Sequence, residues 1–388
     1  MLNLISYLKK RCRDSKLHIL VNYSKFLYLC VKDLLKAILG RIEVRKQNGC
    51  KTSKPKIIQM PLTNNCNLRC KTCNVYNHKG SSLSLTDLQK AVKDDFFSEV
   101  VSVGINGGEP FTSPQINEYL NTVLLLPKLK SVSIISNGIL TSIILDKLEY
   151  IYKKCKEKNV TLLFTTSLDG CKNIHDKIRG LDGAFDKTIK TYHEITSNKN
   201  KYCDKSGIIC TISRYNIYDI KDFIAYVNLH KLENVSYQLA VKHKRLHNEE
   251  MSFSVLDDKY TKMLAQELFY ELFTTTKENK YYFIFRYLND GINRSRMSPC
   301  NFANRDVTID GLGNLLYCAT SSKIIGHITE NNLSEIFFAK ENIDYRKGLV
   351  DNECDGCIHY TGNNGYLKSN MEAYRELKDK STWYYNYL

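Results

Sequence analysis

Three cysteines lie close together early in the chain. Cys66, Cys70 and Cys73 fall within the segment Cys66-Asn-Leu-Arg-Cys70-Lys-Thr-Cys73. One short loop can present three thiolates to three corners of a cubane iron–sulfur cluster, which leaves the fourth iron open. A structural zinc site would require a fourth protein ligand, and His78 is the local candidate. The spacing therefore favours an iron–sulfur cluster with one open iron.

Four more cysteines follow much later in the chain. Cys300 and Cys318 flank a predicted β-hairpin, and Cys354 and Cys357 form a Cys-x2-Cys pair. Four thiolates can fully ligate either zinc or a cubane cluster. Spacing alone does not choose between these two, and a cluster with partial ligation and an open iron is the third alternative.

The elements that must position the first cysteine set are alternating strands and helices. Six β/α units of this kind predict a parallel sheet with right-handed crossovers. They occupy about 185 residues, whereas a full eight-fold barrel usually takes about 250, so we expect an α/β fold with a partial (β/α)6 TIM-type barrel. The predicted strands are Ile57–Thr63, Val101–Asn106, Ser131–Ser136, Val160–Ser167, Gly207–Ser213 and Val235–Ala240. The predicted helices cover about 85–99, 114–125, 140–157, 184–197 and 217–230, with Ser113-Pro114 as a helix start.

Short motifs follow successive predicted strands. The second predicted strand is followed by Gly107-Gly108-Glu109-Pro110, the third ends in Ser136-Asn137-Gly138, and the fourth ends in Ser167-Leu-Asp169-Gly170. His175-Asp176-Lys-Ile-Arg179-Gly180 comes next. Together with the Cys-x3-Cys-x2-Cys loop, these motifs resemble the radical S-adenosylmethionine (SAM) superfamily. The order of the later cysteines resembles the SPASM/twitch extension of that superfamily.

The resemblance implies two kinds of cofactor. A [4Fe-4S] cluster on Cys66, Cys70 and Cys73 would bind SAM through its open iron, and the reduced cluster would cleave SAM to a 5′-deoxyadenosyl radical. A full SPASM domain has further cysteines after its Cys-x2-Cys pair, whereas no cysteine follows Cys357 here. The resemblance is therefore to the shorter twitch arrangement, and we expect one auxiliary [4Fe-4S] cluster, on Cys300, Cys318, Cys354 and Cys357. The resemblance also implies a reductant such as flavodoxin or ferredoxin.

The resemblance gives roles to the strand-end motifs as well. The backbone of Gly107, Gly108 and Glu109 would bind the methionine amino group, since glycines allow close approach of a ligand. Asn137, Ser167 and Asp169 are candidates for contact with the SAM ribose or carboxylate. Asn-Gly and Asp-Gly also form turns without any ligand, so a purely structural role is the alternative for these residues. No residue is assigned to the chemistry on the substrate.

The pattern divides the chain into five segments. A small C-terminal β-hairpin and helix domain would hold the auxiliary cluster, after a mostly helical connector. The segments are a basic helical extension and linker (1–55), the radical SAM core (56–240), the connector (241–295), the SPASM/twitch-like domain (296–360), and a last helix and tail (361–388).

The composition predicts a reduced, cytoplasmic protein. The chain has 388 residues, 14 cysteines and a formal net charge of +15, and it lacks a cleavable signal pattern. Residues 1–50 contain eleven lysines and arginines against three acidic residues, a net of +8. A solvated helix packed on the barrel is one interpretation of this extension. The other is peripheral contact with an anionic membrane at its inner face. We expect no specific nucleic-acid partner.

The substrate stays open at this point. One interpretation is that the enzyme oxidises or cross-links a peptide or protein side chain. The second is radical dehydrogenation or modification of a sugar, polyol or nucleotide-linked metabolite. A non-enzymatic iron–sulfur or nucleic-acid-binding protein is the third, and the Gly-Gly-Glu-Pro segment argues against it because simple cluster scaffolding does not need that segment.

Overall fold

The computed structural model of the protein describes residues 52–78, 82–290, 300–354 and 357–359. The predicted helix of the basic extension, the predicted last helix and tail (361–388) and the membrane contact of residues 1–50 therefore lie outside the described residues. No helix in the described ranges is long and apolar enough to span a bilayer.

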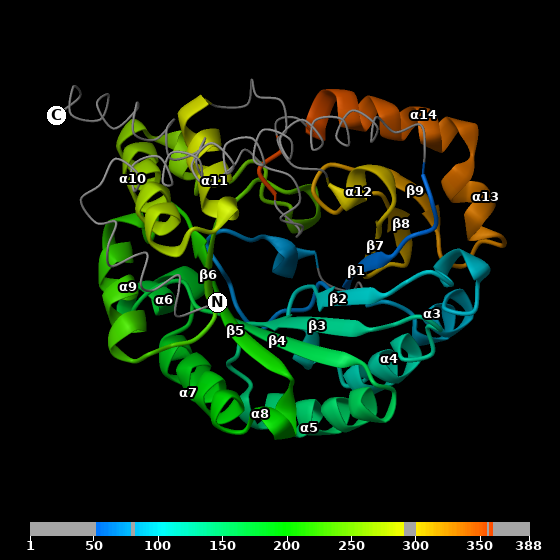
Figure 1. Ribbon diagram of the computed structural model, residues 1–388, viewed down its shortest axis with the longest axis horizontal. Helices are drawn as coiled ribbons and strands as arrows, with labels where there is room; N and C mark the ends of the chain where they lie inside the picture. The colour runs from blue at the N-terminus through cyan, green and yellow to red at the C-terminus, as the bar shows by residue number, and fades with distance from the viewer. Residues whose placement is uncertain (1–51, 79–81, 291–299, 355–356, 360–388) are drawn as a thin grey trace, which may run out of the picture.

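One curved nine-stranded sheet organises the molecule, in the order β6-β5-β4-β3-β2-β1-β7-β8-β9. The first six strands are parallel to their neighbours, as predicted, and their helices lie around the outer face of the curve (Figure 1). The α/β, partial-barrel prediction is confirmed. The strands are β1 (Ile57–Pro61), β2 (Ser102–Asn106), β3 (Ser131–Ser136), β4 (Thr161–Ser167), β5 (Lys205–Ile212), β6 (Val235–Leu239), β7 (Val307–Ile309), β8 (Asn314–Leu316) and β9 (Ile324–His327).

Alternation along the strands separates the two faces of the sheet. In β3, Val132 and Ile134 are fully buried against the helices, whereas Ile135 is partly exposed and lies inside the curve. Side chains of a strand alternate between faces, so each strand contributes one row to the packed core and one to the barrel interior. The covering helices are α3 (Leu85–Ala91), α4 (Ile116–Val123), α5 (Thr141–Glu157), α6 (Lys172–Arg179), α7 (Ala184–Ser197), α8 (Lys199–Tyr202) and α9 (Ile220–Leu229).

The two ends of the sheet carry the remaining elements. Helices α10 (Lys259–Thr276) and α11 (Asn279–Asp290) lie beside β6 (Figure 1), and the N–H of Tyr237 in β6 donates to the Tyr281 hydroxyl of α11 at 3.3 Å. At the other end the predicted hairpin exists as antiparallel β7 and β8, and β7 also pairs in parallel with β1, so the hairpin extends the barrel sheet. This end also holds α12 (Asn301–Asn304), α13 (Leu333–Phe338) and α14 (Lys340–Leu349).

Candidate functional site

The three-cysteine loop leaves β1 at the carboxyl end of the parallel sheet and is tied to the end of α6. The backbone N–H of Arg69 donates to the Arg179 carbonyl at 3.1 Å, and that of Lys71 donates to the Ile178 carbonyl at 2.9 Å. Gly180 ends α6 with φ +69°, and a Cβ there would lie 2.7 Å from the Arg69 carbonyl oxygen. The loop therefore needs a glycine at this position of the motif.

A buried ion pair stands beside the second cysteine of this loop. The Nη2 of Arg179 lies 2.7 Å from Oδ2 of Asp169, with side chains 12% and 4% exposed. Arg179 Nη1 donates to the Cys70 sulfur at 3.7 Å. Burial raises the pKa of the Cys70 thiol, and the guanidinium charge opposes that rise. Arg179 thus favours the thiolate form that a cluster requires.

The Gly107–Glu109 turn fits closely against the start of the cysteine loop. The N–H of Gly108 donates to the Thr63 carbonyl, and the N–H of Glu109 donates to the Asn65 carbonyl at 2.8 Å. A Cβ on Gly108 would lie 2.1 Å from the Asn65 oxygen, and Gly107 has φ +142°. Any side chain at Gly108 would push the turn away from the residues that precede Cys66.

The Glu109 side chain links the ends of two neighbouring strands. It is fully buried, and its carboxylate accepts hydrogen bonds from Phe111 N at 3.2 Å, Ser136 Oγ at 2.9 Å and Asn137 N at 2.7 Å. Burial raises its pKa to about 7 against these three donors. The carboxylate thereby joins the ends of β2 and β3, and protein contacts account for all of its hydrogen bonds.

The other predicted SAM contacts have different surroundings. The Asn137 amide oxygen accepts from Ile139 N at 3.1 Å, which is turn chemistry, and its amide nitrogen donates to Asn67 Oδ1 in the cysteine loop at 2.8 Å. Both carboxylate oxygens of Asp169 have protein partners, Arg179 and the Thr211 N–H at 2.9 Å. Ser167 ends β4 and is partly exposed. Protein contacts therefore account for the Asn137 and Asp169 side chains, and Asp169 acts on the cysteine loop through Arg179.

A cavity of about 440 Å³ lies inside the curve of the sheet and joins the two cysteine sets. Cys73 lines it for the first set, and all four later cysteines line it as well. The strand residues that line this cavity are those whose side chains point to the inner face of the sheet. These strand residues include Gln59, Asn106, Ile135, Ile209, Thr211 and Gln238.

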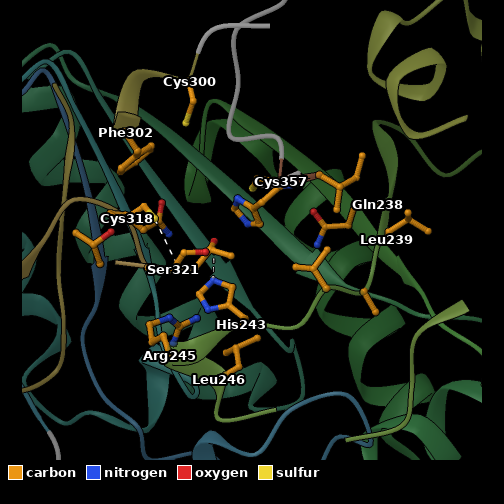
Figure 2. A pocket seen from close by; sticks show the side chains of 18 of the residues that line it. Gln238, Leu239, His243, Arg245, Leu246, Cys300, Phe302, Cys318, Ser321 and Cys357 are labelled. Atoms are coloured by element: carbon orange, nitrogen blue, oxygen red, sulfur yellow. Dashed lines mark hydrogen bonds between the residues drawn. The ribbon is translucent and has the colours of Figure 1, made fainter. Parts of the chain in front are cut away.

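The later cysteines come from separate elements but face one space. Figure 2 shows Cys300, Cys318 and Cys357 around the cavity. The Cys318 sulfur accepts from Ser321 N at 3.5 Å, and the Cys357 sulfur accepts from His359 N at 3.3 Å. Within the described ranges, no three His, Cys, Asp or Glu side chains converge on a single-metal position. Thiolates of a cubane bind different irons, so both cysteine sets fit the donor chemistry of such clusters.

The loop after β6 supplies two residues that the sequence analysis missed. His243 is 6% exposed and lines the cavity, and Arg245 lies next to it in the wall (Figure 2). Burial, then the charges of Arg245 and His359, lowers the pKa of His243 to about 2, so its ring is neutral. The only sequence signal for them is a basic run, His243 to Arg245, directly after a strand at the catalytic end of the sheet.

Residues 60–227 match a family model described as the Radical SAM superfamily. This segment is a radical SAM domain. The superfamily uses a [4Fe-4S] cluster and SAM. The match spans the cysteine loop, the Gly107–Glu109 turn and α6, and it ends before the loop that carries His243 and Arg245.

Curated relatives of the radical SAM domain act in different pathways. The subtilosin biosynthesis protein AlbA of Bacillus subtilis is 33% identical over 133 residues, covering 34% of this chain and 28% of AlbA. An AdoMet-dependent heme synthase of Methanosarcina barkeri is 31% identical over 150 residues (36% and 38%). A GTP 3′,8-cyclase of Clostridium perfringens is 25% identical over 177 residues (44% and 52%). The chain thus spans about a quarter to a half of the length of these relatives.

Solved structures extend the fold similarity beyond the radical SAM domain. AnSMEcpe with bound AdoMet and Cp18Cys peptide has a TM-score of 0.56 at 18% identity, covering 84% of this chain and 97% of that chain. Streptococcus suis SuiB bound to its precursor peptide SuiA has a TM-score of 0.54 at 16% identity, covering 79% and 69%. At these identities the similarity is one of fold, and its coverage of this chain is larger than that of residues 60–227.

Proposed function

We propose that the chain is a radical SAM enzyme that oxidises or cross-links a side chain of a peptide or protein held in the 440 Å³ cavity. The observation that carries this proposal is that Cys73 of the first set and all four later cysteines line one cavity. A substrate bound there would contact the SAM-binding end of the barrel and the auxiliary cysteines at once. That arrangement suits a reaction in which the substrate first loses a hydrogen atom to the 5′-deoxyadenosyl radical, then an electron to the auxiliary cluster and a proton to a base or to solvent.

We assign each of the two groups of cysteines to one iron–sulfur cluster. Cys66, Cys70 and Cys73 would hold the SAM-binding cluster, and Cys300, Cys318, Cys354 and Cys357 the auxiliary one. With these groups bound, the first cluster and SAM supply the radical that removes hydrogen, and the auxiliary cluster supplies an electron acceptor. A flavodoxin or ferredoxin would supply the reducing electron.

The protein's own part is to hold and shield the substrate. Within the Gly107–Glu109 turn, the carbonyls of Gly107 and Gly108 would receive the methionine ammonium group. The N–H groups of Gly108 and Glu109 already bond the segment before Cys66, and the Glu109 carbonyl accepts from Thr112. Arg179 fixes that loop electrostatically. Inward-facing aliphatic side chains such as Ile135 and Ile209 give the cavity apolar surface, which limits access of water to reactive species.

The shape of the site supports an extended substrate. A second cavity of about 280 Å³ shares lining residues with the first, among them Leu239, Ala240 and Cys357, and reaches the exposed side chain of Leu256. The two cavities adjoin at the end of β6 and together enlarge the space open to a substrate. The named structural neighbours anSMEcpe and SuiB have bound peptides, which is consistent with a peptide in this space.

A nucleotide-linked substrate is the second candidate. It is favoured by the similarity of the radical SAM domain to GTP 3′,8-cyclase. The +15 net charge of the chain is compatible with either class, since it attracts phosphates and acidic peptides alike.

Mass spectrometry separates the two candidates. Anaerobically reconstituted enzyme, SAM and dithionite are incubated with short peptides encoded beside its gene, and in parallel with GTP and nucleotide sugars. We expect a peptide product lighter by two hydrogens. A Cys354→Ala/Cys357→Ala variant should still release 5′-deoxyadenosine without completing that product. Turnover of only the nucleotide compounds would overturn the peptide assignment, and full product from the variant would overturn the electron-acceptor role.

A further inference from the structure

The loop after β6 places a cation in the wall of the cavity without a hydrogen-bonding partner at its tip. The Nη1 atom of Arg245 is buried and bonds no polar atom in the described part of the chain. Burial lowers the pKa of Arg245, and the charges of Asp310 and of Cys73, which is assigned to the first cluster, oppose that shift. Asp310 is occupied by its own turn, where it accepts from Leu312 N at 2.8 Å and from Asn314 N at 3.0 Å.

A second unpartnered nitrogen lies beside it. His243 is 6% exposed, and its Nδ1 atom also bonds no polar atom of the described residues. Its Nε2 lies 3.4 Å from the Thr320 hydroxyl. If that hydroxyl donates, the proton of the neutral ring is on Nδ1, and this N–H is free to donate. Figure 2 shows His243 and Arg245 adjacent in the cavity wall.

Buried polar groups are almost always hydrogen-bonded, and a buried charge is costly unless it is paired. Two adjacent donors that lack partners therefore point to a ligand acceptor. Among the residues that line the cavity in the described ranges, Glu353 is the one acid, and it is exposed. The wall thus offers the Arg245 Nη1 group and, with the Thr320 hydroxyl donating to Nε2, the His243 Nδ1–H, and no internal carboxylate receives them.

We propose that Arg245 and His243 form a carboxylate-binding subsite for the substrate, so that the bound peptide presents an Asp or Glu side chain or its C-terminus to this wall. The inference rests on the proposed function in that the cavity holds the substrate. A guanidinium binds a carboxylate through two parallel N–H bonds, and the His243 N–H adds a third donor. The subsite would fix which residue of the peptide lies between the two cysteine sets.

Trifluoroacetate is a suitable probe, because its binding can be followed by fluorine NMR without turnover. Reconstituted protein saturated with SAM should bind trifluoroacetate saturably, and the neutral trifluoroethanol should not bind. Arg245→Gln should weaken trifluoroacetate binding at least tenfold, and His243→Phe should weaken it less. Lys244→Gln is the matched control, since it removes a positive charge from the neighbouring exposed side chain and should leave binding unchanged.

A second measurement covers the case in which these variants differ in folding. Without ligand, the unpaired charge of Arg245 destabilises the folded protein. Arg245→Gln should therefore raise the urea midpoint of the metal-free protein, whereas Lys244→Gln should not. Equal trifluoroacetate binding by wild type and Arg245→Gln would overturn the subsite. So would loss of the probe on addition of SAM, because the wall would then serve the SAM carboxylate. A lowered urea midpoint for Arg245→Gln would assign the guanidinium a structural role instead. None of these outcomes depends on whether the enzyme releases 5′-deoxyadenosine.

Discussion

Replacing Arg179 with glutamine should destabilise the protein far more than an ordinary surface change. The substitution leaves the Asp169 carboxylate, whose side chain is 4% exposed, with the Thr211 N–H at 2.9 Å as its remaining partner. Removing one partner of a buried ion pair costs about 3–5 kcal/mol. Because the Arg179 side chain keeps 12% exposure, we expect the lower end, about 3 kcal/mol.

The same helix provides the control. Lys172 at the start of α6 pairs with Asp186 at 2.6 Å, and both side chains are 58% exposed. Lys172→Gln should therefore change the free energy of unfolding by less than about 1 kcal/mol. Urea unfolding of the metal-free proteins measures both. Adding Asp169→Asn to Arg179→Gln should recover part of the loss, since the two residues are coupled. Equal destabilisation by the two single variants would refute the role assigned to this pair.

Three further predictions concern the cofactors and the extension. Gly108→Ala should lower the free energy of unfolding by about 1–3 kcal/mol and weaken SAM binding, because the added Cβ would lie 2.1 Å from a backbone oxygen. Gly348→Ala is the control, since a Cβ at Gly348 has no atom within 4 Å, and it should have neither effect. Equal effects of the two variants would refute the close fit at Gly108. Anaerobic reconstitution should yield about eight irons per chain, and the alanine variant of the three-cysteine loop should keep about half; one cluster plus zinc would contradict the auxiliary-cluster assignment. Full-length protein should sediment with anionic liposomes at low salt and lose this on deletion of residues 1–50; equal behaviour of both forms would remove the membrane proposal.

The strands were predictable because their signal is local. β3 covers the predicted residues, and the other barrel strands differ from their predicted ranges by at most two residues at either end. Alternation of apolar and small polar residues carries this information. The pairing of β7 with β1 joins segments about 250 residues apart, and no local pattern could reveal it.

Helix starts were less predictable. Ser113-Pro114 was expected to begin a helix, but α4 begins at Ile116. The Ser113 hydroxyl accepts from Gln115 N at 3.3 Å, so it closes a turn ahead of the helix instead of capping it. The same local chemistry serves turns and caps, and tertiary packing decides between them.

The residues of the site likewise divide into those that local sequence predicts and those that only the fold brings together. The cysteine loop and the glycine turn could be predicted, because few other residues fit their geometry. The partners of Asp169 and Asn137 were not, since both side chains meet residues from other elements of the barrel. His243 and Arg245 lie in a segment predicted as a helical connector, whose first part is a loop with short 3₁₀ turns. A loop has no periodicity to read, and only the fold brings it to the cavity.

Release of 5′-deoxyadenosine tests the central claim most directly. Reconstituted wild-type protein with SAM and dithionite should form it slowly even without substrate, and the variant with alanine at Cys66, Cys70 and Cys73 should form none. Chromatography with mass detection measures the product. Undiminished 5′-deoxyadenosine from the triple variant, or none from a wild type shown to contain both clusters, would contradict the assignment of radical SAM chemistry to this cysteine loop.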